Sequence, residues 1–250
     1  MKAFVISLAE SGARRDFMAR QLERLGLDFE FFDGVRGSER VGERASYDRE
    51  GALRREGREL RAGEIGAALS HGAVYAEIDR RALPWALVLE DDAELSPDLP
   101  AVIGALEDGV LEQGDVVLLE RCDRVAPLSV RNLVGRYRIA RPVLLRAGAA
   151  AQAAGYVVTL AAAAAMKGVN LPVTFPADSW GYYRELVRFR GILPSRALVR
   201  QVLEFGSYTL GRERRAFGRS SLLGLLAHDF LTYTRVGRSM LPIAKRIAGR

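Results

Sequence analysis

Apolar residues in the first part of the chain fall into short runs separated by a helical stripe. Residues 3–6 form an apolar run that predicts a strand. From Ser11 to Leu25 apolar side chains recur at helical spacing, and Gly26 stands where a helix would end. Residues 29–32 predict a second strand. A strand–helix–strand opening implies parallel strands and an α/β fold.

Similar patterns predict alternating helices and strands as far as residue 167. The expected elements are a helix at 64–80, a strand at 85–89, a helix at 97–107, a strand at 115–119, one or two strands within 136–145, a strand at 156–160 and a helix at 161–167. Residues 36–61 are polar, rich in arginine and without a clear period, which predicts a mobile loop of the kind that often serves as a lid. Beyond residue 186 the pattern weakens, and we expect a helix at 221–233 followed by a basic tail.

Three adjacent carboxylates follow an apolar run at residues 86–89. They are Glu90, Asp91 and Asp92. Four apolar residues are typical of a strand buried on both faces, and the carboxyl ends of such strands form the ligand crevice of open α/β sheets. Mutual repulsion between the three acids would raise their pKa values and cost stability unless positive charge offsets it.

A divalent metal ion is one partner that would relieve this repulsion. Oxygen ligands select Mg²⁺ or Mn²⁺, which bind through one or two carboxylates together with substrate phosphates. We therefore predict a metal held by Asp92 and Glu90, with Asp91 in support, that bridges a nucleotide diphosphate and offsets its charge as it departs. The alternative is a charged turn whose carboxylates are hydrated or paired with arginine.

The composition is that of a globular protein in a reducing compartment. The chain has 250 residues, of which 49% are hydrophobic and 27% charged, so it can bury one full core. Its single cysteine, Cys122, excludes a disulfide framework and a cysteine-based zinc site. The first apolar run is too short for a signal peptide, and we expect a cytoplasmic protein.

Positive charge is concentrated toward the end of the sequence. The chain carries 37 Lys and Arg against 31 Asp and Glu, a net charge of +6, and residues 235–250 include basic but no acidic side chains. Such a tail suits peripheral contact with the anionic inner face of the cytoplasmic membrane, or is simply solvated. We expect no nucleic-acid partner, because aromatic residues make up only 8% of the chain and no RNA- or DNA-binding motif accompanies the basic residues.

Five short blocks follow one another along the sequence: FVISL at 4–8 followed by two arginines, GEIGAALSH at 63–71, LVLEDD at 87–92, AGYVVT at 154–159 and PAD at 176–178. In content and order they resemble glycosyltransferase family 25, the lipooligosaccharide glycosyltransferases. The GEIG…SH and LEDD blocks are the most specific. AGYVVT departs mildly from the family at Thr159, where the family block has serine.

This resemblance implies a GT-A-type fold, which is a Rossmann-like sheet with helices on both faces. It also implies a nucleotide-sugar donor, UDP-galactose or UDP-glucose, with Mn²⁺ or Mg²⁺, and transfer of the hexose with inversion to a saccharide or glycolipid acceptor. We place this catalytic domain at residues 1–185 and a mainly helical, basic C-terminal extension at 186–250.

Inverting transfer requires one general base to take the proton of the acceptor hydroxyl. Asp178 is the first candidate, since it closes the PAD block and lies near Trp180, which suits stacking on a sugar; it suits the cap of a helix equally well. Glu64 is the second candidate. Glu64 and His71 are seven residues apart, so they project from a helix in nearly the same direction. With Ser70 they would shape contacts to donor or acceptor, although a helical histidine is often a buried structural residue.

Three further residues are candidates for contacts to the nucleotide. Arg14 and Arg15 lie in the first turn of the first expected helix, whose N-terminus would point into the crevice toward phosphates. Asp33 ends the second strand and could bind the base or the ribose. The alternatives are a solvated arginine pair and a turn formed by Asp33 with Gly34.

Two other functions would use the same features. A metal-dependent nucleotidyltransferase or phosphohydrolase would employ the same acidic cluster. A non-catalytic, membrane-associated scaffold of a glycan assembly complex would need the basic tail but not the acids. A P-loop kinase is not expected, because the sequence contains no GxxxxGK[ST] motif.

Overall fold

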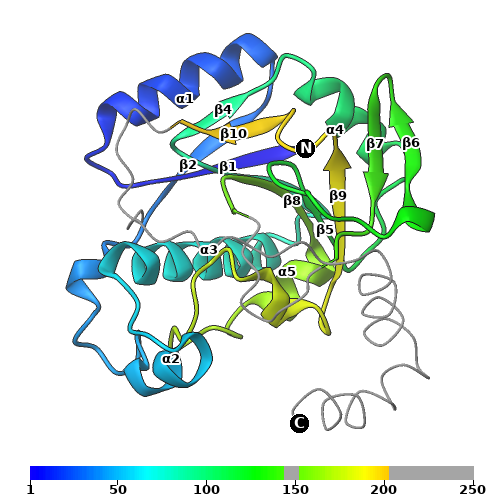
Figure 1. The fold of residues 1–250 in the computed structure, drawn as a ribbon. Coiled ribbons are helices and arrows are strands. Elements are labelled where there is room, and N and C mark those ends of the chain that lie inside the picture. The colour runs from blue at the N-terminus through cyan, green and yellow to red at the C-terminus, as the bar shows by residue number, and fades with distance from the viewer. Residues whose placement is uncertain (144–151, 203–250) are drawn as a thin grey trace, which may run out of the picture.

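A large sheet lies between two layers of helices (Figure 1). The computed structural model describes residues 1–143 and 152–202. The strands are β1 Lys2–Ser7, β2 Phe29–Asp33, β3 Trp85–Glu90, β4 Ala93–Leu95, β5 Asp115–Leu118, β6 Arg131–Val134, β7 Tyr137–Ala140, β8 Gly155–Thr159, β9 Arg188–Leu193 and β10 Val199–Gln201. The α-helices are α1 Gly12–Leu25, α2 Arg49–Glu56, α3 Ala62–Arg80, α4 Leu99–Glu107 and α5 Leu160–Met166. Short 3-10 helices are η1 Gly37–Glu39, η2 Pro127–Ser129 and η3 Trp180–Tyr183.

The main sheet is mixed, with strand order β2-β1-β3-β8-β5-β9-β7-β6. β1 pairs in parallel with β2 and β3, so the expected strand–helix–strand opening is confirmed. β8 runs antiparallel between β3 and β5, while β9 is parallel to β5 and joins the antiparallel β7–β6 hairpin to the sheet. The carboxyl ends of β1 and β3 therefore meet at one edge, where ligands bind in this class of fold.

Alternate side chains of the central strands enter two separate cores. α1 and α4 pack on one face, where Leu22 and Leu87 belong to the same apolar cluster. α3 and α5 cover the other face, where Val74 joins Val88. The neighbours Leu87 and Val88 are thus buried on opposite faces, as the period of two in a strand requires. The predicted α/β class, a Rossmann-like sheet with helices on both faces, is confirmed.

Segment 36–61 is not a structureless loop, which corrects the prediction. It contains η1 and α2. Asp48 caps α2 by accepting the Gly51 N–H at 2.9 Å, and Gly57 ends the helix in the left-handed conformation. Only Gly51 and Ala52 of α2 are buried, so the helix has no apolar stripe that the sequence could reveal.

Strands also occur where the sequence pattern is weak. β9 follows residue 185, the predicted end of the catalytic domain, yet it lies inside the main sheet, so the sheet extends beyond that boundary. β10 pairs antiparallel with β4 to form a second, two-stranded sheet. The helix predicted at 221–233 and the basic tail at 235–250 lie outside the described residues.

The remaining predicted elements are present within a few residues of their expected bounds. α3 begins two residues before the predicted start at residue 64, and α4 begins two residues after residue 97. The region 136–145 contains β7, whose hairpin partner β6 was not predicted. Within residues 1–143 and 152–202, no helix has the length and apolar character needed to cross a bilayer.

Candidate functional site

A cavity of about 360 Å³ opens where β1 and β3 end. Its walls come from the tips of these strands, the start of α1, the loop 34–38, the first turns of α3 and the end of β10. Its volume lies within the range of small-molecule sites, and its position is the crevice expected for an open α/β sheet. The polar lining includes Ser7, Arg14, Ser70, Glu90, Asp91, Asp92 and Gln201.

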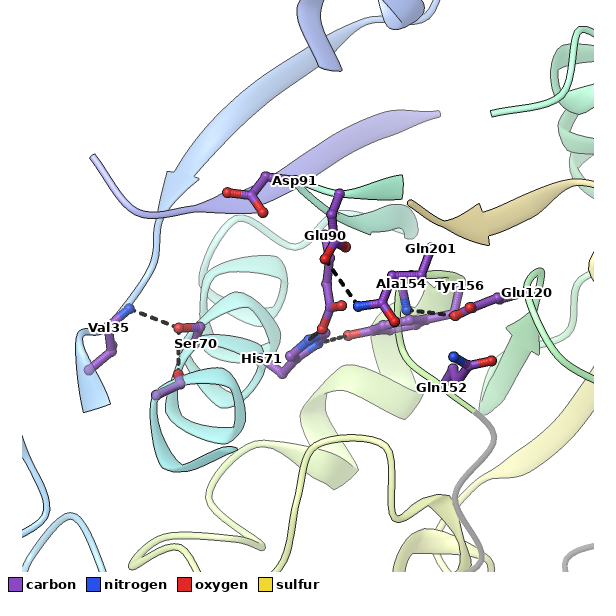
Figure 2. Close-up of polar contacts among 12 residues, drawn as sticks. Val35, Ser70, His71, Glu90, Asp91, Glu120, Gln152, Ala154, Tyr156 and Gln201 are labelled. Carbon is purple, nitrogen blue, oxygen red and sulfur yellow. Dashed lines mark hydrogen bonds and ion pairs between the residues drawn. The ribbon is translucent and has the colours of Figure 1, made fainter. Parts of the chain in front are cut away.

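Two glycines let the loop and α3 approach backbone to backbone. A Cβ on Gly37 would lie 1.7 Å from the carbonyl oxygen of Ala62, and one on Gly66 would lie 2.5 Å from that of Val35. Ser70 supports the same contact, because its Oγ donates to Gly66 O at 2.7 Å and accepts the Val35 N–H at 2.8 Å (Figure 2). The Ser70 hydroxyl is therefore engaged within the protein and fixes the cavity wall.

Asp91 is fully engaged by protein groups. Ser7 Oγ donates to its Oδ2 at 2.7 Å, and Arg14 Nη1 donates to its Oδ1 at 2.7 Å. Arg14 Nη1 also lies 3.7 Å from Asp92 Oδ2, so one guanidinium offsets part of the charge of two carboxylates. Of the two arrangements considered for the acidic turn, Asp91 is therefore paired with an arginine. Arg14 itself lines the cavity, and its charge faces the acidic turn.

Asp92 retains an unused oxygen. Gln201 Nε2 donates to Oδ2 at 3.0 Å, whereas Oδ1 is buried and has no hydrogen-bond partner. Burial is the main reason that the pKa of Asp92 rises to about 7, and the nearby charge of Glu90 raises it further. A buried carboxylate oxygen without a donor is costly, so this position suits a cation shared with Glu90.

Glu90, the last residue of β3, is joined to His71 on α3. His71 Nε2 lies 3.2 Å from Glu90 Oε1, and Nδ1 lies 2.7 Å from the hydroxyl of Tyr156 (Figure 2). His71 is only 2% exposed and does not line the cavity. The predicted contact of His71 with a donor phosphate or acceptor hydroxyl stays a prediction, and what the structure shows is a contact to Glu90.

Glu64 is occupied by the capping of α3. Its carboxylate accepts the Arg61 N–H at 2.8 Å and two bonds from Arg58 at 2.6 Å and 2.8 Å. These contacts complete a capping box at the start of the helix. Because its oxygens are already taken by these donors, Glu64 is less available to an acceptor hydroxyl, and the geometry favours the first candidate base instead.

Asp178, the first candidate base, is partly buried two residues before the start of η3. Burial, followed by the charges of Glu90 and Glu64, raises its pKa to about 6. The charge of Glu90 acts on Asp178, although Asp178 is not among the cavity-lining residues. The alternative role as a helix cap is wrong, because Ser179 occupies the N-cap position of η3 and no side chain caps it.

Arg15 and Asp33 are paired with each other and are not among the cavity-lining residues. Arg15 Nη2 also donates to the carbonyl oxygen of Ser7 at 3.1 Å, and its guanidinium lies 5.1 Å from the centre of the Phe31 ring. The pair therefore ties α1 to the ends of β1 and β2. The predicted contacts of Arg15 and Asp33 with a nucleotide stay predictions.

Glu120 is a buried acid near the site that the sequence analysis did not single out. It is 3% exposed, and its Oε2 accepts the Ala154 N–H at 3.1 Å (Figure 2). Burial, and then the charges of Glu90 and Asp92, raise the pKa of Glu120 to about 8. One sequence signal could have found it: VVLLE at 116–120 repeats the pattern of LVLE at 87–90, an apolar run followed by an acid.

The acidic turn fits a divalent cation in part. Among the described residues, no group of three or more His, Cys, Asp or Glu side chains is arranged to hold a metal by itself. Glu90 and Asp92 fit an ion that takes its other ligands from water and phosphate, because Mg²⁺ commonly binds through one or two carboxylates. The unpartnered Oδ1 of Asp92 supports this fit, whereas both oxygens of Asp91 are already bonded.

The Rossmann-like sheet and the acidic cavity at its strand ends define an α/β protein with a ligand site in the usual crevice of that class. The model of glycosyltransferase family 25, described as LPS biosynthesis proteins, matches residues 1–180. This chain belongs to glycosyltransferase family 25 and is a glycosyltransferase. The resemblance seen in the sequence blocks is thereby confirmed.

Solved structures match the chain at low similarity, and two of them are as follows. A protein described as a glucose-1-phosphate thymidylyltransferase from Bacillus anthracis, in complex with sucrose, is 13% identical with a TM-score of 0.36, and the match covers 75% of this chain and 66% of that one. A mannose-1-phosphate geranyltransferase from Thermus thermophilus is 15% identical with a TM-score of 0.31, over 77% of this chain and 58% of that one. The chain thus spans less than two thirds of their lengths. The comparison with curated proteins gives no match.

Proposed function

We propose that this glycosyltransferase transfers a hexose from a nucleotide diphosphate sugar to a lipooligosaccharide or another cell-surface glycan. UDP-galactose and UDP-glucose are the favoured donors, with Mn²⁺ or Mg²⁺ held by Glu90 and Asp92 and inversion at the anomeric carbon. The sheet would serve as a GT-A-type platform for the nucleotide. Membership of family 25 supports the nucleotide-sugar donor and the saccharide acceptor.

The observation that carries this proposal is the unpartnered Oδ1 of Asp92 beside Glu90. An aspartate whose pKa is raised by burial, and further by a neighbouring acid, is stabilised in its charged form when a cation lies between the two acids. When bound, the divalent ion supplies charge neutralisation for the departing diphosphate. Arg14, whose Nη1 lies 2.7 Å from Asp91, keeps a fixed positive charge in the same wall.

Asp178 is the proposed general base. With a pKa of about 6 its carboxylate is ionised at neutral pH, yet it binds a proton more readily than an exposed aspartate does. The acceptor hydroxyl oxygen bonds to the anomeric carbon, the bond from that carbon to the diphosphate oxygen breaks, and Asp178 takes the hydroxyl proton. Attack on the face opposite the leaving group inverts the anomeric centre.

Peripheral contact with the anionic inner face of the cytoplasmic membrane is part of the proposal. The net charge of +6 and the basic residues within 235–250 support it, since each basic side chain near such a surface adds attraction. Co-sedimentation of the full chain with anionic vesicles, reversed by high salt, is the expected result. Equal binding to neutral vesicles would contradict an electrostatic contact.

Thermal-shift measurements with UDP-galactose and UDP-glucose, each with and without Mn²⁺, test the donor and metal sites. A donor that binds only the folded state increases the free energy of unfolding, by about 2.7 kcal/mol at 100 times its Kd. The melting temperature rises as a result. We expect a shift that requires Mn²⁺ and disappears in Asp92→Asn. Asp16→Asn, which alters an exposed acid on α1, is the matched control. Transfer of hexose to an added saccharide should be lost in Asp178→Asn.

Three outcomes would contradict parts of this function. If the donor stabilises the protein equally well without Mn²⁺, the proposed role of the metal ion in donor binding is contradicted. Formation of a nucleotide sugar from a nucleoside triphosphate and a sugar phosphate would identify a nucleotidyltransferase. An Asp92→Asn variant that fully supports glycan synthesis in cells would favour a scaffold role.

A further inference from the structure

A chain of buried hydrogen bonds leads from Glu90 into the core between α3 and β8. His71 Nε2 lies 3.2 Å from Glu90 Oε1, His71 Nδ1 lies 2.7 Å from the Tyr156 hydroxyl, and that hydroxyl lies 3.0 Å from the hydroxyl of Tyr75. Figure 2 shows His71 between Glu90 and Tyr156. The histidine and both tyrosines are at most 2% exposed. Of these four hydrogen-bonded residues, Glu90 is the one that lines the cavity.

The donors and acceptors of these groups determine which group donates in each of the two hydrogen bonds of His71. An ionised carboxylate only accepts hydrogen bonds, so the proton facing Glu90 must be on His71 Nε2. Neutral imidazole then has a bare Nδ1, which must accept the single proton of the Tyr156 hydroxyl. The Tyr156 hydroxyl also lies 3.0 Å from the hydroxyl of Tyr75, so it has polar neighbours on both sides.

We propose that His71 is a positioning residue: Glu90 and Tyr156 together favour its Nε2–H tautomer, and its Nε2–H directs the Glu90 carboxylate toward the metal and donor. This role rests on the proposed function in one respect, namely that Glu90 is a metal ligand. Hydrogen bonds to a ligating side chain fix its orientation, and their removal typically lowers metal affinity by about 10–100-fold.

The surroundings hold the rings of this chain in place. The rings of His71 and Tyr156 are stacked, with centres 5.7 Å apart and planes 25° apart, and the Trp180 ring packs edge-on against Tyr156 at 5.0 Å. Burial raises the pKa of Tyr156 and of Tyr75 well above the usual value, so both hydroxyls remain proton donors. The rings are therefore held in place, and both hydroxyls stay protonated.

The backbone of Glu90 is held separately from its side chain. The Glu90 N–H donates to Ala154 O at 3.0 Å, and the Ala154 N–H donates to Glu120 Oε2 at 3.1 Å. Ala154, held in turn by a buried acid, thus fixes the end of β3 in the sheet. What remains to be set is the direction of the Glu90 carboxylate, which is the task assigned to His71.

The tautomer can be read directly by ¹⁵N NMR of the imidazole rings. The chain has only two histidines, so His228→Gln leaves the signals of His71 alone. We expect a protonated Nε2 and a bare Nδ1 in the metal-free protein, and a weaker preference for this tautomer in Tyr156→Phe, which keeps the ring and removes the hydroxyl while Glu90 still faces Nε2. A protonated Nδ1 in the otherwise native protein would overturn the inference. This measurement needs neither metal nor activity.

Mn²⁺ affinity tests the consequence for Glu90. Electron paramagnetic resonance of free Mn²⁺, with UDP present, should give a Kd about 10-fold higher in Tyr156→Phe. The matched control is Tyr137→Phe, which removes another buried hydroxyl, bonded to Asp98 at 2.8 Å, and should leave the Kd unchanged. An unchanged Kd in Tyr156→Phe, or an equal rise in Tyr137→Phe, would overturn the positioning role alone. Native protein that binds no Mn²⁺ would overturn the proposed metal site and with it this role for Glu90.

Discussion

Two buried aspartates, Asp92 and Asp115, have opposite surroundings. Asp92 follows the carboxyl end of β3, whereas Asp115 begins β5, and these strands run in the same direction because each is antiparallel to β8. The two acids therefore lie at opposite ends of the parallel strands β3 and β5. They are 6% and 0% exposed, so burial alone does not distinguish them.

Their hydrogen-bond partners do distinguish them. Arg188 Nε lies 2.9 Å from Asp115 Oδ1, and Oδ2 is reached by Arg190 Nε at 2.9 Å and by the Glu112 N–H at 3.0 Å. Asp92 Oδ2 accepts one bond from a glutamine, and Oδ1 has no hydrogen-bond partner. A buried acid with complete partners stabilises the fold, whereas an incomplete one beside a cavity is available to a ligand.

Asp92→Asn should produce the largest effect, a fall in transfer rate of about 10³-fold, because several kcal/mol of charge stabilisation at the diphosphate are lost. The fold should not be weakened, since the substitution removes a buried charge next to Glu90. Steady-state rates at saturating Mn²⁺ and a melting curve on the same sample measure both quantities. An unchanged transfer rate would show that Asp92 has no role in the reaction.

Asp115→Asn should show the reverse behaviour. Its arginines lose their carboxylate, and we expect the free energy of unfolding to fall by about 2–3 kcal/mol. Urea denaturation with an unchanged slope measures this loss, and the activity of the remaining folded protein should stay close to normal. If Asp92→Asn costs more stability than Asp115→Asn, the distinction between the two acids fails.

The backbone contact between loop 34–38 and α3, which forms part of the cavity wall, can be tested without changing an acid. Gly66→Ala should lower the free energy of unfolding by about 1–3 kcal/mol, because overpacking must push the loop 34–38 away. Donor binding should weaken with it, since that loop lines the cavity. Gly72→Ala on the same helix is the control: a Cβ there meets nothing within 4 Å. That change should stabilise the protein by about 0.5–1 kcal/mol. Similar behaviour of the two variants would exclude the backbone contact.

The smallest expected effect concerns Glu120 and pH. Its pKa in the folded protein is about 8, above the ordinary 4.5, so its proton stabilises the fold below the ordinary value and this contribution is lost as the pH rises through 8. Glu120→Gln keeps an oxygen for the Ala154 N–H and cannot ionise. Its melting temperature in metal-free buffer should exceed that of the native protein by about 2–4 °C more at pH 9 than at pH 5. A pH-independent difference would refute this.

Most of the helices and strands could be predicted from the sequence, whereas the order in which distant strands pair could not. β1, α1, β2, α3 and β3 follow one another along the chain and have strong local periods. The insertion of β8 between β3 and β5, and of β9 between β5 and β7, depends on pairing between distant segments. No local pattern contains that information, which is why the predicted boundary at residue 185 falls just before a strand of the sheet.

The site follows the same rule. Glu90 and Asp92 stand out because three acids after an apolar run are chemically unusual in sequence. The sequence cannot tell which of the three is neutralised, and only the structure shows that Asp91 is the one held by Arg14. Gln201 was not predicted because β10 is short and its partner β4 is far away in the chain.

The place of β5 between β8 and β9 has a consequence for synthesis. β5 ends at residue 118, whereas β8 starts at residue 155 and β9 at residue 188. A chain leaving the ribosome from its N-terminus therefore presents both edges of this apolar strand until β8 emerges, and one edge until β9 follows. Release of the nascent chain at residue 180, where the family match ends, would leave that edge open to pairing with another molecule.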